Sequence, residues 1–197
     1  MVSGPVIAEP SLAAATLEDC LLRRRSRRSF CPEPLTGDEL ARLCWAAQGT
    51  TSEDGGRTAP SAGGIHPLEL YAVTPVGVFL YDPLQDCLAR VLTGDRRPVL
   101  CTAAGSQDVI GLAATTLVLV AIEGMMEPRY GQRSRRYELI EAGHVGQNVL
   151  LAAAALDLCA VPVGAFDDAA VADALLLPDG RSPVYLIALG HAPGEGS

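Results

Sequence analysis

Hydrophobic side chains recur at every third or fourth position between Thr36 and Gly49, which is the spacing of one face of an α-helix. The apolar residues on this face are Leu40, Leu43, Cys44 and Ala47. Thr36 and Glu39 have the spacing of a capping box at a helix start, and glycine is common at a helix end. The pattern predicts a helix that begins after Thr36 and ends before Gly49.

Other segments have the alternating or continuous apolar pattern of β-strands. Residues 68–73 and 78–81 flank the turn sequence Pro75-Val76-Gly77, which predicts a β-hairpin. Residues 116–122 are rich in β-branched and aliphatic side chains and predict a buried strand. Residues 184–189 predict a final strand.

Helical spacing also occurs near the N-terminus, where a helix is predicted to end close to Arg23. Its apolar positions are Leu12, Leu17, Leu21 and Leu22. We expect residues 1–11 to form a flexible arm before it. Residues 84–114 are predicted to be helical, with breaks at Gly94, Pro98 and Gly105.

A long proline-free segment, residues 134–158, is polar at its start and then apolar on nearly every side over residues 149–156. Such a helix is buried in a core or in a subunit interface. Asp167 or Asp168 is predicted to cap a short helix that runs through Leu176.

The order of elements favours an α+β fold over a Rossmann sheet, because helices, a hairpin and scattered strands follow one another without regular βαβ repeats. A chain of 197 residues is long enough for one well-buried domain, and no glycine- and serine-rich or charged linker divides it. We therefore expect a single domain over residues 12–197.

Composition excludes several classes of function. A net charge of −8 argues against nucleic acid as the main partner. The six cysteines form no C-x-x-C pair, so the sequence suggests neither a metal site nor a disulfide framework. There is no signal-like N-terminus and no apolar run long enough to span a bilayer, so we expect a cytoplasmic protein without a membrane partner.

Positive charge is concentrated in one segment, Arg23-Arg24-Arg25-Ser26-Arg27-Arg28, and all 15 basic residues of the chain are arginines. In an extended stretch Arg24, Ser26 and Arg28 would point the same way, and guanidinium groups flanking a hydroxyl suit a phosphate. The alternative is a solvated basic helix end.

Two more segments have the small residues that allow a ligand to approach the backbone closely. Pro60-Ser61-Ala62-Gly63-Gly64 contains paired glycines, although a flexible surface turn is the alternative. Gly164 and Ala165 lie shortly before a predicted helix start, where N–H groups can face an electron-rich ring edge; an ordinary connection is the alternative. The three segments together supply what a bound flavin mononucleotide (FMN) would need.

These segments, in this order, resemble the FMN-dependent nitroreductase family, which has R-x-S-x-[RK]-x-F, a P-S-rich loop and a later P-x-x-G-F-like segment. The resemblance covers residues 21–190 and is closest to the SagB-type azoline dehydrogenases. It rests on Pro60-Ser61-Ala62-Gly63-Gly64-Ile65-His66-Pro67 and on Glu141-Ala142-Gly143-His144-Val145-Gly146-Gln147-Asn148.

The resemblance implies an antiparallel-rich central sheet flanked by helices, and a homodimer whose long central helices pack at the interface. It implies two FMN sites there, with the loop around Ser61 reaching the flavin of the neighbouring subunit. The cofactor-binding residues carried over by position are Arg24, Arg25, Ser26 and Arg28 at the ribityl phosphate, Pro60, Ser61, Ala62 and Gly63 in the loop, and Gly164 and Ala165 near flavin N5.

Two features depart from the family. The chain has Arg129 and Tyr130 where the azoline dehydrogenases have a Lys-Tyr pair assigned to proton abstraction, and arginine cannot serve as that base. Arg129 and Tyr130 are the candidate catalytic residues. At the C-terminus, where relatives place a basic residue over the phosphate, only His191 could help.

The resemblance implies an oxidoreductase that moves hydride through flavin N5, similar to SagB-type dehydrogenases acting on a modified peptide. An NAD(P)H-dependent reductase of small nitroaromatics or quinones is the first alternative. A non-catalytic subunit of the same fold that docks a peptide or a partner enzyme is the second.

Overall fold

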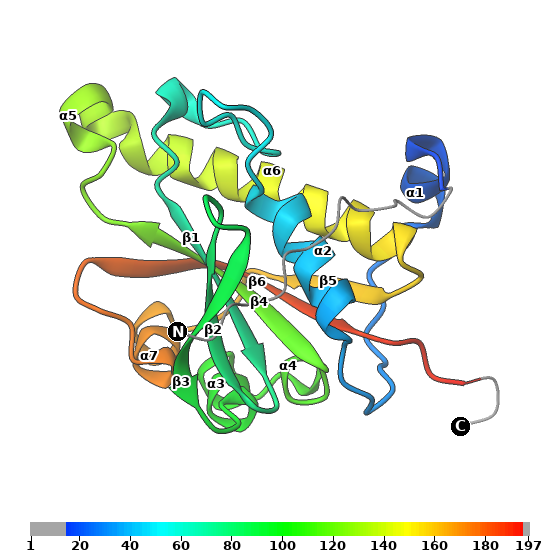
Figure 1. Ribbon diagram of the computed structural model, residues 1–197. Helices are drawn as coiled ribbons and strands as arrows, with labels where there is room; N and C mark the ends of the chain where they lie inside the picture. The colour runs from blue at the N-terminus through cyan, green and yellow to red at the C-terminus, as the bar shows by residue number, and fades with distance from the viewer. Residues whose placement is uncertain (1–14, 195–197) are drawn as a thin grey trace.

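A computed structural model describes residues 15–194, so the predicted arm and Leu12 lie outside the described residues. One six-stranded sheet forms the centre of the fold (Figure 1). Its strands are β1 (Leu68–Thr74), β2 (Gly77–Asp82), β3 (Cys87–Thr93), β4 (Thr115–Ile122), β5 (Cys159–Val163) and β6 (Arg181–Gly190). They lie in the order β3-β2-β1-β4-β6-β5, and every neighbouring pair is antiparallel. The antiparallel sheet and the α+β class are confirmed.

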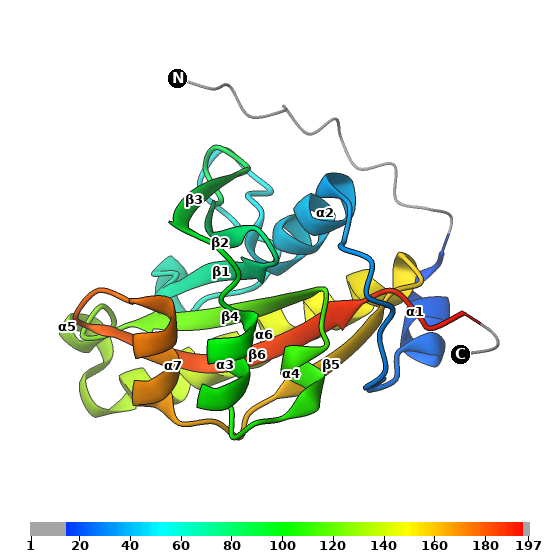
Figure 2. The same ribbon diagram turned by 90° about the horizontal axis from the view of Figure 1, so that it is seen from below.

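Helices cover both faces of this sheet (Figures 1 and 2). The α-helices are α1 (Leu17–Arg23), α2 (Gly37–Gln48), α3 (Arg97–Ala103), α4 (Asp108–Gly111), α5 (Glu127–Tyr130), α6 (Ser134–Ala155) and α7 (Asp168–Leu175). Two short 3₁₀ helices, η1 (Ala62–Gly64) and η2 (Gly131–Arg133), precede β1 and α6. Helices α2 and α6 lie on one face of the sheet, and α3, α4 and α7 lie on the other. Helix α1 contacts the C-terminal end of α6. No helix within residues 15–194 is long and apolar enough to cross a membrane.

Side-chain caps fix where several helices begin. The predicted capping box of Thr36 and Glu39 is present at α2, and Gly49 follows its last residue. An equivalent box of Thr16 and Asp19 starts α1. Asp167 caps α7 through a hydrogen bond that its carboxylate accepts from the Ala170 N–H. These residues satisfy N–H groups that a helix start leaves free.

The hydrophobic core has two parts, one on each face of the sheet. Strand β4 contributes to both: Leu117 and Leu119 pack under α2 and α6, whereas Val118 and Val120 pack against α3 and α7. All these side chains are fully buried. A strand buried on both faces has a continuous apolar sequence, so β4 was predictable.

The two strands that the sequence pattern missed are the edge strands of the sheet. Residues 84–114 were expected to be helical, but β3 occupies residues 87–93; only α3 and α4 bear out the expectation. Strand β5 falls where a connection between helices was expected. An edge strand pairs with only one strand of the sheet, so Pro162 is tolerated in β5. Consecutive side chains of a strand point to opposite faces, and both Arg90 and Val91 are exposed, so β3 is left uncovered on both faces here.

Candidate active site

The arginine segment runs along the edge strand β5. Ser26 forms a parallel bridge with Ala160, and the Arg27 N–H donates to the Ala160 carbonyl at 3.1 Å. The segment is therefore extended at this point, as the phosphate hypothesis requires. Strict alternation would place Arg24 and Arg28 on the side of Ser26 and Arg25 on the other side. The structure departs from this expectation, because Arg24 is the C-cap of α1 and lines the same cavity as Arg25.

A cavity of about 520 Å³ lies between this segment and the C-terminal end of α6. Its basic lining residues are Arg23, Arg24, Arg25 and Arg27. Its acidic lining residue, Asp157, is already paired with Arg23 at 2.6 Å. The remaining guanidinium groups give the cavity a net positive charge in a chain whose total charge is −8. Such a site suits an anion, and phosphate matches the guanidinium geometry.

The structure divides the predicted phosphate residues between two places. Arg24 and Arg25 line the cavity, whereas Ser26 and Arg28 do not. His191 turns away from it: its Nε2 lies 3.5 Å from Oε2 of Glu39. Ala192, the next residue, does line the cavity.

The loop after β5 presents backbone N–H groups without partners. Gly164 and Ala165 are exposed, and neither amide donates to another residue in the described chain. A Cβ built on Gly164 meets no atom within 4 Å, so the fold itself does not require glycine there. The absent side chain leaves room for a ligand against these amides.

The loop of residues 60–64 lies beside Arg129 and Tyr130, the candidate catalytic pair. The sequence did not predict this contact. The Arg129 guanidinium donates to the Gly63 carbonyl at 3.3 Å and lies 5.6 Å from the centre of the Tyr130 ring. Gly63 has φ +66°, and a Cβ there would lie 2.5 Å from Arg129 Nη1. The positive φ favours glycine at this position, and any larger residue would also have to displace the ends of the Arg129 and Tyr130 side chains. Tyr130 is also packed edge-on against Tyr137, with ring centres 4.8 Å apart.

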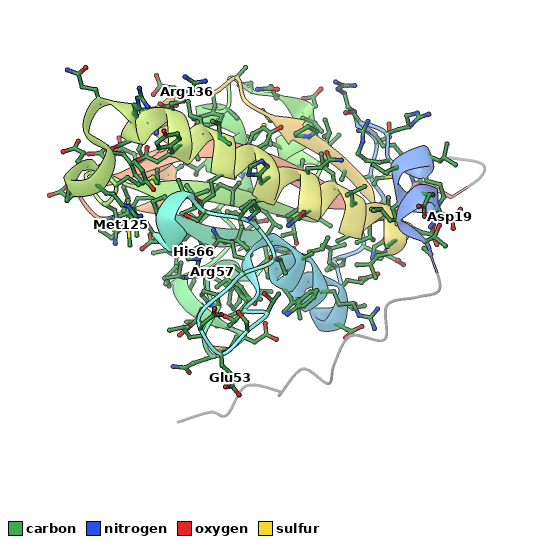
Figure 3. The ribbon with its side chains drawn as sticks, turned by 90° about the horizontal axis from the view of Figure 1, so that it is seen from above. Asp19, Glu53, Arg57, His66, Met125 and Arg136 are labelled. Atoms are coloured by element: carbon green, nitrogen blue, oxygen red, sulfur yellow. The ribbon has the colours of Figure 1, made fainter. Side chains whose placement is uncertain are left out.

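A cluster of ionisable side chains lies next to the same loop. The Ser61 hydroxyl accepts a hydrogen bond from the His66 N–H at 2.9 Å, and His66 Nδ1 lies 4.0 Å from Glu141 Oε1. Arg57 and His66 lie side by side under α6 (Figure 3) and line a cavity of about 390 Å³. No sequence pattern pointed to Arg57, which lies in a polar loop.

Burial controls the protonation of this cluster. Glu141 is 2% exposed, and its Oε2 has no hydrogen-bond partner among residues 15–194. Burial raises its pKa to about 7; the Ser61 hydroxyl and Arg57 oppose the shift, and Glu138 adds to it. Burial and the neighbouring Arg57 charge lower the pKa of His66. Near neutral pH the imidazole is mostly uncharged and the carboxyl is partly protonated.

Within one chain the predicted cofactor residues do not come together. The arginine cavity lies at the C-terminal end of α6, whereas Ser61–Gly64 and Arg129 lie at its N-terminal end. Figure 3 shows this separation, with Asp19 marking α1 and His66 marking the loop. Helix α6 has 22 residues and is therefore roughly 33 Å long.

The outer face of α6 lies between these two groups. It exposes Leu139 and Ile140, at 48% and 45%. Gly143 is also exposed, and a Cβ there would meet no atom within 4 Å. Gly146 is different, because a Cβ there would lie 2.7 Å from the Tyr185 ring. Within the predicted apolar run of residues 149–156, Val149 and Leu150 are buried in the protomer's own core. These two residues therefore do not belong to the outer face of α6.

The domain is antiparallel α+β, with an anion cavity at the start of β5 and exposed amides after its end. This is the arrangement that the sequence resemblance implied for an FMN-dependent oxidoreductase. The model of the nitroreductase family matches residues 21–191. The chain belongs to the nitroreductase family, and the predicted enzyme class, an FMN-dependent oxidoreductase of this family, is confirmed at the level of the family.

Individual relatives agree with this assignment. The chain is 38% identical over 188 residues to "Putative nitroreductase MJ1384" of Methanocaldococcus jannaschii, covering 92% of this chain and 94% of that protein. A crystal structure of a putative nitroreductase from Ralstonia eutropha JMP134 is 31% identical, with a TM-score of 0.87, over 95% of this chain and 89% of that one.

The Escherichia coli microcin synthetase McbBCD complex with truncated pro-MccB17 bound also contains a similar chain. The identity is 20% and the TM-score 0.75, over 98% of this chain and 79% of that one. This likeness concerns the fold alone.

Proposed function

We propose that the protein binds FMN and acts as a dehydrogenase similar to the SagB type. The observation that carries the proposal is the pairing of an arginine-lined cavity with free amides along one strand edge. Ser26 is bridged to Ala160, and Ala165 lies five residues further on, roughly 16 Å along an extended chain. That distance suits a phosphate at one end and a flavin ring at the other.

The residues present fit this cofactor in charge and in shape. Arginines supply phosphate ligands, and Gly164 and Ala165 supply N–H donors with open space in front of them. The flavin, when bound, supplies hydride transfer at N5. The protein binds and orients it, and its amides favour electron density at the ring edge.

A two-fold dimer through α6 would complete the site. If two copies of α6 cross near Gly143, the arginine cavity of one protomer comes close to the partner's loop of residues 60–64. Exposed Leu139 and Ile140 would be covered, and the empty space over Gly143 would admit the other helix. We therefore propose a homodimer with composite sites.

Arg129 supports a second candidate, an NAD(P)H-dependent reductase of small nitroaromatics or quinones. Its guanidinium is held by the Gly63 carbonyl and remains a cation, so it cannot remove a proton from an azoline ring. A fixed cation instead attracts anionic substrate groups or stabilises negative charge that develops during reduction.

The visible spectrum of the purified protein tests cofactor binding directly. We expect a flavin spectrum, either as purified or after addition of FMN; a protein that stays colourless after FMN addition contradicts the proposal. Anaerobic mixing with NADPH then separates the two candidates. Rapid bleaching of the flavin indicates the reductase, whereas sluggish bleaching indicates a dehydrogenase driven by its acceptor.

A further inference from the structure

Gln107 ties the turn between α3 and α4 to the loop that carries Ala165. Its side-chain amide donates two hydrogen bonds of 2.7 Å each, one to the Ala104 carbonyl and one to the Ala165 carbonyl. Both partners are acceptors, so the NH₂ group, and not the amide oxygen, must face them. The side chain therefore links two segments that are 58 residues apart in sequence.

A second bond secures the same loop. The Asp167 N–H donates to the Ala103 carbonyl at 3.2 Å. The Ala165 carbonyl and the Asp167 N–H belong to consecutive peptide groups. The carbonyl is bound through Gln107 to the turn after α3, and the N–H is bound to the last residue of α3. Carbonyls at a helix end have no partner within the helix, so this loop and Gln107 also satisfy groups that α3 leaves free.

The anchor itself is well held. Gln107 stands at the start of α4, and its own carbonyl accepts a hydrogen bond from the Cys101 thiol at 3.3 Å. The Ser106 N–H donates to the Cys101 carbonyl at 2.9 Å. The tether therefore connects the loop to a turn with its own hydrogen bonds, and not to a free surface side chain.

We infer that Gln107 is a positioning residue that fixes the direction of the Gly164 and Ala165 amides toward the flavin. The inference rests on the proposed function, because these amides have a task only if a flavin ring faces them. The tether holds the carbonyl side of the loop against α3 and leaves the two N–H groups free. Donors held in place before the ligand arrives need no reorganisation during the reaction.

The test compares Gln107→Met and Gln107→Glu with the parent and with Gln85→Met. Methionine has a similar length without donors, and glutamate places a carboxylate against two carbonyls. Gln85 is exposed, and no hydrogen bond of its side chain is found in the described chain. In the protein without cofactor, we expect the Asp167 amide to exchange with solvent about tenfold faster in both Gln107 variants, and at the parent rate in Gln85→Met.

The flavin-loaded proteins give the second measurement. We expect both Gln107 variants to shift the visible bands of bound FMN and to be reoxidised by menadione several-fold more slowly after photoreduction, with an FMN dissociation constant within threefold of the parent. Parental exchange at Asp167 and a parental flavin spectrum in both variants would overturn the inference while leaving the proposed function intact. A parent that binds no FMN overturns the proposed function and with it the positioning role. This holds even if the exchange rates show that the Gln107 hydrogen bonds hold the loop.

Discussion

His66 Nδ1 lies 4.0 Å from Glu141 Oε1, beneath the loop that carries Ser61. Because burial raises the pKa of Glu141 to about 7, the folded protein binds a proton here that the unfolded chain has already lost above its ordinary pKa of 4.5. Stability therefore falls as the pH rises between these two values. His66 has the opposite effect: its lowered pKa makes stability fall as the pH drops below about 6.5.

Replacing Glu141 by glutamine should remove the fall in stability with rising pH that this carboxyl causes. Relative to the parent, we expect Glu141→Gln to gain roughly 3 kcal/mol in free energy of unfolding between pH 4.5 and 7.5. Urea unfolding at several pH values measures this gain. Glu123→Gln, at an exposed site, is the control and should keep the parental slope. Identical slopes for the parent and Glu141→Gln would show that the carboxyl titrates normally.

The arginine segment predicts a face-dependent loss of FMN. In the first variant Arg24 and Arg28 are both replaced by alanine, and in the second Arg25 and Arg27. If the face of Arg24, Ser26 and Arg28 holds the phosphate, as the sequence alternation predicts and the cavity lining does not, the first variant should bind FMN roughly 100-fold more weakly. The reason is that hydrogen bonds to charged groups contribute about 1.5–3 kcal/mol each. The second should lose much less.

Fluorescence titration with FMN measures both affinities, and circular dichroism checks the fold. The cavity contains Arg25 and Arg27 but not Arg28. A larger loss in the Arg25 and Arg27 variant would therefore reassign the phosphate to the other face. Two variants as yellow as the parent would exclude the segment altogether.

The two glycines of α6 predict opposite effects. Gly143→Leu adds a side chain where the protomer has open space, so the protomer should gain about 0.5–1 kcal/mol of helix stability while the dimer dissociates. Gly146→Ala places a Cβ 2.7 Å from the Tyr185 ring and should lower the melting temperature instead. Sedimentation velocity and thermal unfolding separate the two effects. A dimeric, flavin-loaded Gly143→Leu protein would rule out α6 as the interface.

Strand β4 and helix α2 were predictable because local sequence determines them. Leu117 and Val118 face different cores, so the strand is apolar throughout, and Thr36 with Glu39 marks a helix start regardless of the rest of the fold. Edge strands lack such a signal. The half-solvated β3, with Arg90 exposed, did not have a strand pattern.

The segments of the candidate site were predictable, but their arrangement was not. Arg24 and Gly164 were recognised from residue type, spacing and family resemblance. Their separation from Ser61 along α6 depends on the path of the whole chain, as does the contact between Arg129 and Gly63. The burial of Glu141 depends on packing from several elements, and its motif position gave no warning of a raised pKa.

Arg129 gives the prediction that separates the two candidate reactions. Its guanidinium contacts Gly63 and Tyr130, so it is fixed beside the loop proposed to reach the partner's flavin. Arg129→Lys keeps a cation and introduces a group that can lose a proton, whereas Arg129→Ala removes both. For a reductase, we expect the lysine variant to keep most of its nitroaromatic and quinone turnover and the alanine variant to lose about tenfold or more. For a dehydrogenase that lacks only its base, thiazoline-peptide oxidation should appear or rise in the lysine variant alone. Steady-state rates with the three substrate classes distinguish these outcomes. Arg90→Ala is the control, because Arg90 lies on the edge strand β3 and its guanidinium contacts the Phe79 ring. Unchanged rates for every substrate in both variants would make Arg129 a structural support of the loop and leave Tyr130 as the remaining catalytic candidate.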